Sequence, residues 1–271
     1  MVGVKFIGRL GNQLFQYYFL QYLKTRAPEK FYFFSNPHHA YLARYFELGW
    51  YHNLTLDSKL YSILARAIPK VLSFREVPVH NFFSPKPIQV QDGTVYTGYY
   101  QSDYYIRAVN PPHPLRLKTK FVEAFRKKYG DVFDHHPTVT VHIRRTDYLN
   151  YQNRDISLPL AHFQRQLYGI PDLDRYVVFF VSDDLDYVKK GIPERPNFRF
   201  VANDEITDFQ LIQHADIAII SNSTFAWWAA YLSPKKNRVI APKNWMGFRI
   251  GREHPRGIMT DRFEWVEVPP C

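Results

Sequence analysis

The stretch VTVHIRRTDYLNY, residues 139–151, begins as a buried β-strand and ends in charge. Its first residues are mostly β-branched, which is typical of a strand inside a sheet. Polar groups then crowd the strand end within six positions, at His142, Arg144, Arg145 and Asp147. A solvated strand end explains one or two such groups. Four converging groups indicate a ligand.

Strands and helices alternate after this stretch. The predicted strands are YVVFFVSDD, FRFV, DIAIISNS and RVIAP, and helices are predicted near residues 118–129, 160–168, 185–190, 207–214 and 224–232. Continuous apolar strands separated by helices are typical of a parallel sheet covered on both faces. The sequence therefore predicts an α/β fold.

The first residues show the same order, a predicted strand followed by a predicted helix. A strand pattern at residues 2–7 leads through the loop GRLGNQ into a helix with apolar residues at spacings of three and four. The proline-rich segment 35–115 gives one further prediction, a helix near residues 57–68. We predict two lobes, residues 1–135 and residues 136–271.

Composition narrows the class of partner. The 271 residues carry a formal net charge of +10, which favours nucleic acid, an acidic membrane surface or a phosphorylated substrate. The single cysteine, Cys271, excludes an intrachain disulfide and fits a reducing compartment. No signal-peptide pattern and no long apolar run is present. We expect a cytoplasmic protein whose basic surface could hold it loosely at the inner face of a membrane.

Ligands of open α/β sheets bind beyond the carboxyl ends of the strands. Arg144 lies at such an end, and its planar guanidinium suits the oxygens of a diphosphate. Arg145 points to the other side and is expected to be a structural partner. Asp147 has two equally weighted roles, as a proton acceptor or as the partner that orients an arginine.

Two more clusters follow predicted strands. In SDD (Ser182, Asp183, Asp184) a carboxylate could bind ribose hydroxyls or a purine edge, but capping of the next helix is an equally good explanation. In SNSTF, residues 221–225, hydroxyls and backbone N–H groups at a helix start suit a phosphate. We expect Trp227 and the neighbouring Trp228 to belong to the core.

The loop GRLGNQ is a weaker signal. It matches neither a dinucleotide-binding GxGxxG nor a P-loop, although glycine lets backbone approach a ligand and Arg9 or Asn12 could reach one. Nowhere do His, Cys or paired carboxylates show metal-site spacing, so we expect no metal and no other cofactor. His38-His39 and His135-His136 are expected at the surface.

Five motifs occur together in one order: GRLGNQLFQY, HIRRTDY, VSDD, ISNSTFAWWAAYL and VIAPKNW. In this the chain resembles the α-1,2-fucosyltransferases, glycosyltransferase family 11. The resemblance implies a GT-B-like fold of two Rossmann-like lobes with a cleft between them, in which residues 1–135 form the acceptor-side lobe with the GRLGNQ loop and residues 136–271 the GDP-sugar-binding lobe. It also implies GDP-β-L-fucose as donor, a β-galactoside as acceptor, inversion at the anomeric carbon, and no metal requirement.

The resemblance also implies roles for individual residues. It implies that Arg144 stabilises the charge of the departing GDP and that Asn12 lies close to the reacting centre. The family gives no unambiguous catalytic carboxylate, and Asp147 is our first candidate for the base. Arg9 and Tyr148 are expected on the acceptor side. Donor contacts are implied for His142, Arg144, Ser182, Asp183, Asp208, Ser223, Thr224, Phe225 and Gly11. The chain departs from the commonest pattern at Thr146, where many members have glycine, and in its single Gly8-Arg9. Neither departure removes a charge or a hydrogen-bond donor.

Other functions fit some of these features. The nearest alternative is a fucosyltransferase of another linkage, of the α-1,6 or O-fucosyl type. A basic, aromatic nucleic-acid-binding protein would spread its arginines along one face rather than gather them at a strand end. A carbohydrate-binding module has no use for a diphosphate site. We therefore expect no nucleic-acid partner. Because the sequence opens at the GRLGNQ motif without the membrane anchor of the animal Golgi enzymes, we also expect a bacterial enzyme acting on lipid-linked polysaccharide units.

Overall fold

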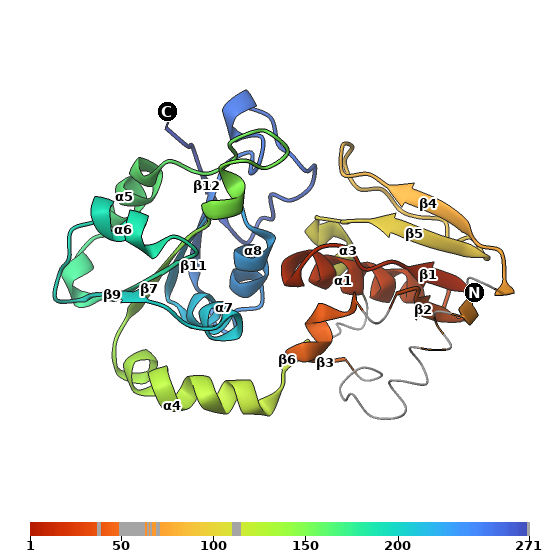
Figure 1. Cartoon of the computed structure of the whole chain (residues 1–271), viewed down its shortest axis with the longest axis horizontal. Coiled ribbons are helices and arrows are strands. Elements are labelled where there is room, and N and C mark those ends of the chain that lie inside the picture. Colours follow the sequence, from red (N-terminus) through yellow and green to blue (C-terminus); the bar gives the residue numbers. More distant parts are fainter. Residues whose placement is uncertain are drawn as a thin grey trace. The chain divides into compact units, whose positions relative to one another are not determined.

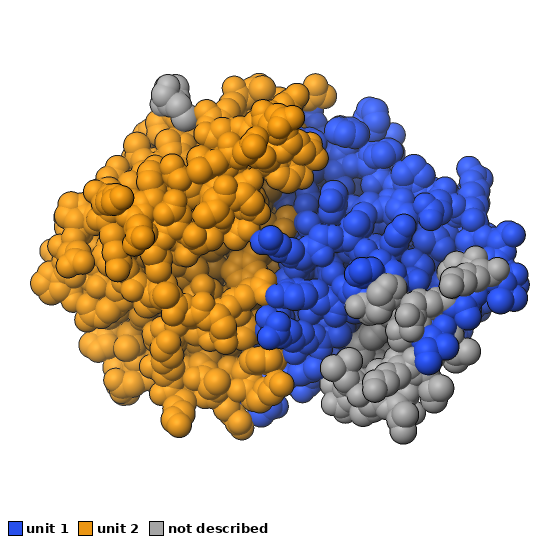
Figure 2. All heavy atoms as spheres, viewed as in Figure 1, with its two compact units in different colours: residues 1–119, 254–258 blue, residues 120–253, 259–271 orange. Residues whose placement is uncertain are grey.

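The computed structural model describes residues 1–36, 39–48, 71–109 and 115–269, together with residues 63, 65, 67 and 68. The chain forms two compact units (Figure 2). Unit 1 holds Met1–Thr119 and His254–Ile258, and unit 2 holds Lys120–Glu253 and Met259–Cys271. This division lies earlier than the predicted 135/136, and a short segment near the C-terminus returns to unit 1.

Unit 1 is built on a four-stranded parallel sheet with the order β2-β1-β5-β4. The strands are β1 Val2–Val4, β2 Tyr32–Phe34, β4 Arg75–Val79 and β5 Thr94–Gly98. The other elements are the helices α1 Leu10–Arg26 and α3 Asp103–Arg107, the 3₁₀ turn η2 Tyr41–Arg44, and the antiparallel pair β3 Phe46–Glu47 and β6 Arg116–Leu117.

The predicted strand, loop and helix at the N-terminus are confirmed, with a shorter strand. Helix α1 buries an aromatic face on which the rings of Phe19 and Tyr100 stack 3.6 Å apart. Strands β4 and β5 were not predicted, because prolines surround them in the sequence and a proline, Pro78, lies inside β4. The helix predicted near residues 57–68 lies mostly outside the described residues.

Unit 2 has a six-stranded sheet, all parallel, with the order β12-β11-β10-β7-β8-β9 (Figure 1). The strands are β7 Thr138–Ile143, β8 Val177–Ser182, β9 Phe198–Val201, β10 Ile217–Ile220, β11 Arg238–Pro242 and β12 Glu264–Val266. The helices are α4 Thr119–His135, α5 Leu160–Tyr168, α6 Leu185–Gly191, α7 Glu205–His214 and α8 Thr224–Tyr231. Short 3₁₀ turns are η3 Thr146–Tyr148, η4 Leu173–Arg175 and η5 Phe248–Ile250.

The sheet of unit 2 is covered on both faces, as its continuous apolar strands predict. Val178 and Phe180 of β8 pack in one cluster with residues of α5 and α6. The alternate residues Phe179 and Val181 pack against α4 and α7 on the other face. Aromatic side chains of α4 therefore belong to the core of unit 2, which explains why the unit boundary lies before this helix and not after it. Trp227 and Trp228 are fully buried, as predicted.

Strand β7 lies where the strand order of this sheet reverses. The chain proceeds from β7 to β8 and β9 on one side, and then returns to place β10, β11 and β12 on the other side. Such a reversal opens a crevice beyond the carboxyl ends of the two strands where it occurs, here β7 and β10. The charged end of the stretch at residues 139–151 lies at this position.

Candidate functional site

Arg144 follows β7 directly and is held by two carboxylates. Its Nε donates to Oδ1 of Asp147 at 2.8 Å, and its Nη2 donates to Oδ2 of the same residue at 2.7 Å. Its Nε also lies 3.2 Å from a carboxylate oxygen of Asp183. The guanidinium is therefore fixed in place, and Asp147 has the arginine-orienting contact that was one of its two predicted roles.

This arrangement leaves one edge of the guanidinium for a ligand. The ion pair with Asp147 uses Nε–H and one N–H of Nη2. Neither N–H of Nη1, nor the second N–H of Nη2, donates to any described residue. Two of these donors, one on each nitrogen, form the Nη1–Nη2 edge, whose geometry matches two oxygens of a phosphate.

Asp183 follows β8 and accepts hydrogen bonds from the turn that presents Arg144. Its Oδ1 accepts the backbone N–H of Arg145 at 2.8 Å, and its Oδ2 accepts that of Thr146 at 3.2 Å and the Thr146 hydroxyl at 2.5 Å. The side chain is only 18% exposed. A contact of Asp183 with ribose or base was predicted and stays a prediction, while both carboxylate oxygens accept hydrogen bonds from the arginine turn.

The remaining residues of the SDD motif have structural contacts. Asp184 is the N-cap of α6 and accepts the backbone N–H of Tyr187 at 3.2 Å, as the capping alternative predicts. Ser182 accepts the backbone N–H of Asp184 through its hydroxyl at 3.0 Å. Arg145 donates to Asp184 at 3.1 Å and lies 3.8 Å above the ring of Tyr187, so its predicted structural role is confirmed.

His142 joins the two strands of the crevice. Its Nδ1 lies 2.8 Å from the hydroxyl oxygen of Ser221, the first residue after β10. Burial, together with the nearby charge of Arg144, lowers the pKa of His142 to about 4. The imidazole is therefore neutral at physiological pH. Its ring lies 5.9 Å from that of Phe225, in α8.

The start of α8 is the second part of the crevice. Ser223 is the N-cap, but its hydroxyl makes no capping hydrogen bond. The preceding Asn222 is turned inward, and its Nδ2 donates to the carbonyl of Ile156 at 2.9 Å. Tyr148 donates its hydroxyl to the carbonyl of Asn222 at 3.2 Å, which ties the arginine turn to this helix start. Because β7 and β10 are parallel neighbours, Ser223 and Thr224 lie at the same edge of the sheet as Arg144.

Asp208 lies in the first turn of α7, within a hydrogen-bond network that was not predicted from the sequence. Its Oδ1 accepts from Nδ2 of Asn203 at 3.0 Å, and Oδ1 of that asparagine accepts from Lys128 at 2.6 Å and from the Tyr129 hydroxyl at 2.9 Å. Burial raises the pKa of Asp208 to about 6. The signal available in the sequence was the position of Asn203, which follows strand β9.

The predicted residues of unit 1 gather at the start of α1. Oδ1 of Asn12 accepts from Gln101 at 2.9 Å, so this side chain has a fixed orientation. Gly8 has a φ of +76°, and a Cβ at this position would lie 2.5 Å from Nδ2 of Asn12. Glycine is therefore required here. Arg9 is the exposed N-cap residue, and Gly11 is buried in the first helical turn.

The crevice of unit 2 thus combines a fixed guanidinium edge, a helix start and a neutral imidazole. These groups suit a diphosphate with an attached aromatic base. Within the described ranges, no group of three His, Cys, Asp or Glu residues is arranged to hold a metal ion. None of the helices in those ranges is both long and apolar enough to cross a membrane.

Comparison with solved structures supports the architecture. The chain is similar to the fucosyltransferase NodZ from Bradyrhizobium, with a TM-score of 0.52 at 14% identity over 88% of this chain and 94% of that one. A structure of NodZ α-1,6-fucosyltransferase crystallised with GDP gives a TM-score of 0.53 at 14% identity, over 90% and 95% of the two chains. The predicted GT-B-like α/β fold is confirmed by this likeness, which at such identity concerns the fold alone.

Three curated relatives match parts of the chain. The Escherichia coli α-1,2-colitosyltransferase is 28% identical over 64% of this chain and 62% of its own length. The Caenorhabditis elegans galactoside 2-α-L-fucosyltransferase is 29% identical over 52% and 43%, and the E. coli O-antigen biosynthesis glycosyltransferase WbnK is 29% identical over 40% and 39%. The matched segments thus span less than two thirds of each relative.

The family assignment rests on a longer match. Residues 96–266 match the sequence profile of glycosyl transferase family 11, which covers more than half of the chain. The match includes β7, the arginine turn, the SDD motif and the start of α8, the elements that form the crevice of unit 2. The chain therefore belongs to glycosyl transferase family 11.

Proposed function

We propose that this protein is an inverting α-1,2-fucosyltransferase that moves L-fucose from GDP-β-L-fucose to the 2-hydroxyl of a terminal β-galactoside. The observation that carries the proposal is the ligand-facing edge of Arg144 at the strand-order reversal of unit 2. Membership of family 11 and the names of two relatives support sugar transfer to a 2-position.

In the proposed reaction the acceptor O2 attacks the anomeric carbon while the bond from that carbon to the β-phosphate oxygen breaks, and the proton of the attacking hydroxyl is released to the departing phosphate or to solvent. The departing GDP gains negative charge, and preorganised charges are usually the largest contribution to catalysis at such a point. Arg144 would stabilise this charge through its Nη1–Nη2 edge, together with the α8 start at Ser223 and Thr224. Asp147 would act mainly by holding Arg144, because its carboxylate is engaged by that guanidinium.

The nucleoside part of the donor would lie along the same crevice. The neutral His142 and the ring of Phe225 offer an apolar wall for the guanosine, and the carboxylate of Asp208 would accept the N–H donors of the guanine edge. Asp183 and the Ser182 hydroxyl would act by shaping the arginine turn and the start of α6. In unit 1, Asn12 and Gly11 would contact the sugar, and Arg9 would lie on the acceptor side. Tyr148 would complete the acceptor contacts.

The similarity to a colitosyltransferase makes colitosyl transfer the second candidate. Colitose lacks the 3-hydroxyl of fucose, so the two donors differ by one hydrogen-bonding group. A transferase of either kind acting on lipid-linked polysaccharide units would work at the cytoplasmic face of a membrane, which is consistent with the net charge of +10.

The proposed function is tested by turnover with GDP-fucose, lactose and excess EDTA, and with GDP-colitose in a parallel reaction. We expect an α-1,2-linked fucosyl product, identified by NMR, that forms at the same rate with and without the chelator. Faster transfer from GDP-colitose would reassign the donor, and a 1,6-linkage would reassign the acceptor position. Failure to bind GDP would contradict the role of Arg144 in either reaction.

A second expectation concerns pH. Because the pKa of Asp208 is raised to about 6, its carboxylate is ionised at pH 7 and mostly protonated at pH 5. A protonated carboxyl accepts fewer hydrogen bonds from guanine, so GDP should bind about tenfold more weakly at pH 5 than at pH 7. His142 and His214 have pKa values near 4 and stay mostly neutral over this range.

Calorimetric titration of GDP at several pH values checks this expectation. The variant Asp208→Asn should bind GDP weakly at pH 7 and at pH 5, without a loss of affinity between them. The variant Asp186→Asn, which changes an exposed carboxylate of α6, should bind GDP as the wild type does. An unchanged pH dependence in Asp208→Asn would assign the titration to another group.

A further inference from the structure

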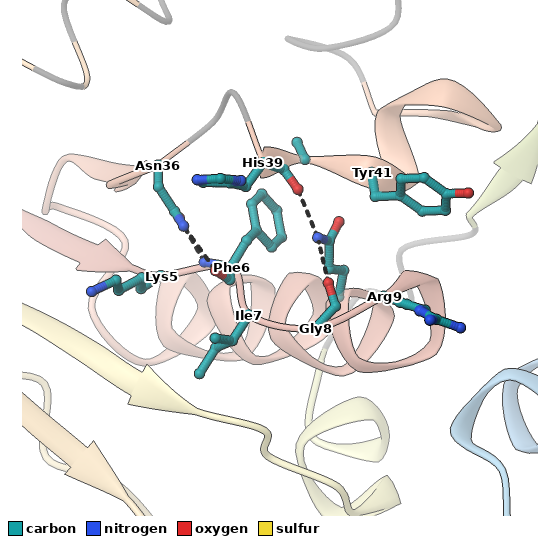
Figure 3. Close-up of a pocket in the computed structure, with 10 residues that line it drawn as sticks. Lys5, Phe6, Ile7, Gly8, Arg9, Asn36, His39 and Tyr41 are labelled. Carbon is teal, nitrogen blue, oxygen red and sulfur yellow. Dashed lines mark hydrogen bonds between the residues drawn. The ribbon is translucent and has the colours of Figure 1, made fainter. Parts of the chain in front are cut away.

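Unit 1 contains a pocket of about 560 Å³ that the donor chemistry does not use. It lies beyond the carboxyl end of β1 and is lined by residues 5–9 together with Asn36, His39, Ala40 and Tyr41 (Figure 3). Its volume falls in the range of about 300–1,000 Å³ that is usual for small-molecule sites. The pocket is formed by residues of unit 1 alone.

The side-chain amides of Asn36 and Gln13 hold the walls of this pocket in place. Asn36 pairs with Phe6, accepting its backbone N–H at 2.7 Å and donating to its carbonyl at 2.8 Å. Gln13 donates to the carbonyls of Gly8 at 3.1 Å and His39 at 2.6 Å, so it joins the two walls. Figure 3 shows these hydrogen bonds across the pocket. The cavity is therefore built before any ligand arrives.

The charged side chains that line the pocket are both cations. Lys5 and Arg9 lie at opposite ends of the segment that lines it (Figure 3), and the lining includes no carboxylate. Neither cation has an ion-pair partner in the part of the chain that the structure describes. Two cations without partners beside a preformed cavity favour an anionic ligand.

The pocket also offers aromatic and amphipathic surface suited to a sugar ring. Tyr41 lines it and is 38% exposed, and Phe6 contributes a buried ring stacked on Phe34 at 4.0 Å. Polar backbone of the Gly8 loop lies beside these rings. A ligand that combines a pyranose with a negative charge would match both properties.

We infer that this pocket binds the acceptor glycan through an anionic sugar unit next to the galactoside. The inference rests on the proposed transfer to a β-galactoside and adds the class of acceptor. The charge could come from a carboxylate, as in an acidic sugar, or from a phosphate ester. Either group would be attracted by Lys5 or by Arg9, which line the two ends of the pocket.

Three acceptors that share a β-galactosyl group test the inference: neutral lactose, lactobionate, which carries a carboxylate, and lactose 1-phosphate. We expect kcat/KM to be about tenfold higher for at least one anion than for lactose at low salt, and to converge as salt rises. Lactobionate alone being preferred would identify a carboxylate, and lactose 1-phosphate alone a phosphate.

The double variant Lys5→Gln/Arg9→Gln should reduce this ratio of efficiencies to near one, and the single variants should show which cation carries it. The matched control is Arg75→Gln/Lys86→Gln, which removes two exposed charges of unit 1 outside the pocket and should keep the ratio. Melting temperature and GDP affinity verify that each variant is folded.

Direct binding separates this inference from the proposed function. Saturation-transfer NMR with lactobionate and with lactose 1-phosphate needs no donor and no turnover. Binding that is lost in Lys5→Gln/Arg9→Gln, without transfer to any acceptor, would support the pocket and overturn the proposed transfer. Equal turnover of all three acceptors would overturn the pocket and leave the transfer standing. Absence of both binding and turnover would overturn both.

Discussion

Replacing Arg144 by alanine is expected to lower kcat with GDP-fucose by about 10² to 10³, the usual loss on removing one strong charge-stabilising contact. The structure gives the reason for so large an effect. The guanidinium is fixed by Asp147 and Asp183, so its Nη1–Nη2 edge is already oriented when the donor binds. No reorganisation is then needed as charge develops on the leaving diphosphate.

Steady-state kinetics with Arg144→Ala and Arg144→Lys measure this contribution. Lysine keeps the charge but loses the planar pair of donors, so its activity should lie between those of the wild type and the alanine variant. The control is Arg238→Ala, which breaks an exposed ion pair with Glu264 in the same sheet and should leave kcat unchanged. An Arg144→Ala enzyme with more than a tenth of the wild-type kcat would contradict the proposed role.

The variant Asp147→Asn completes this experiment by separating the two predicted roles of Asp147. A general base contributes roughly 10² to 10⁴, and its loss removes the acidic limb of the pH–rate profile. A residue that orients Arg144 contributes less, and its loss lowers the rate evenly across pH. The bidentate ion pair leads us to expect the second result, with a loss of about tenfold.

Much of unit 2 could be predicted because its strands are continuous apolar runs. A strand buried on both faces is a continuous apolar run, and FRFV was predicted with its observed bounds for this reason. The helix Leu160–Tyr168, which lies between two such strands, was also predicted with its observed bounds. The strand β12 was missed because its three residues, Glu264–Val266, are too short and too polar for such a pattern. Unit 1 was harder to predict because prolines and loops interrupt its short strands.

Strand order was the main feature that the sequence did not reveal. The residues of HIRRTDY and SNSTF are about 80 positions apart, and periodicity does not tell which strands are neighbours. The pairing of β7 with β10 brings His142 to Ser221 and creates the crevice. The direction of each side chain was equally hidden, since the sequence does not show whether a carboxylate meets a ligand or the backbone.

Asp183 shows this most clearly, and its replacement by alanine is the second large effect that we expect. The carboxylate accepts two backbone N–H groups and one hydroxyl from Arg145 and Thr146, and it also contacts Arg144. Hydrogen bonds to a charged group contribute about 1.5–3 kcal/mol each. Losing this set should release the turn that presents Arg144, and kcat/KM for GDP-fucose should fall about 10²-fold.

A double-mutant cycle distinguishes this positioning role from direct contact with the donor. If Asp183 acts through Arg144, the variant Arg144→Ala/Asp183→Ala should be little slower than Arg144→Ala alone, because the second change removes support for a group already absent. Two independent donor contacts would instead give losses that multiply. Asp186→Ala, an exposed carboxylate three positions along the chain, should leave turnover unchanged. Multiplicative losses would return Asp183 to the ribose or base contact that its place in the SDD motif first indicated.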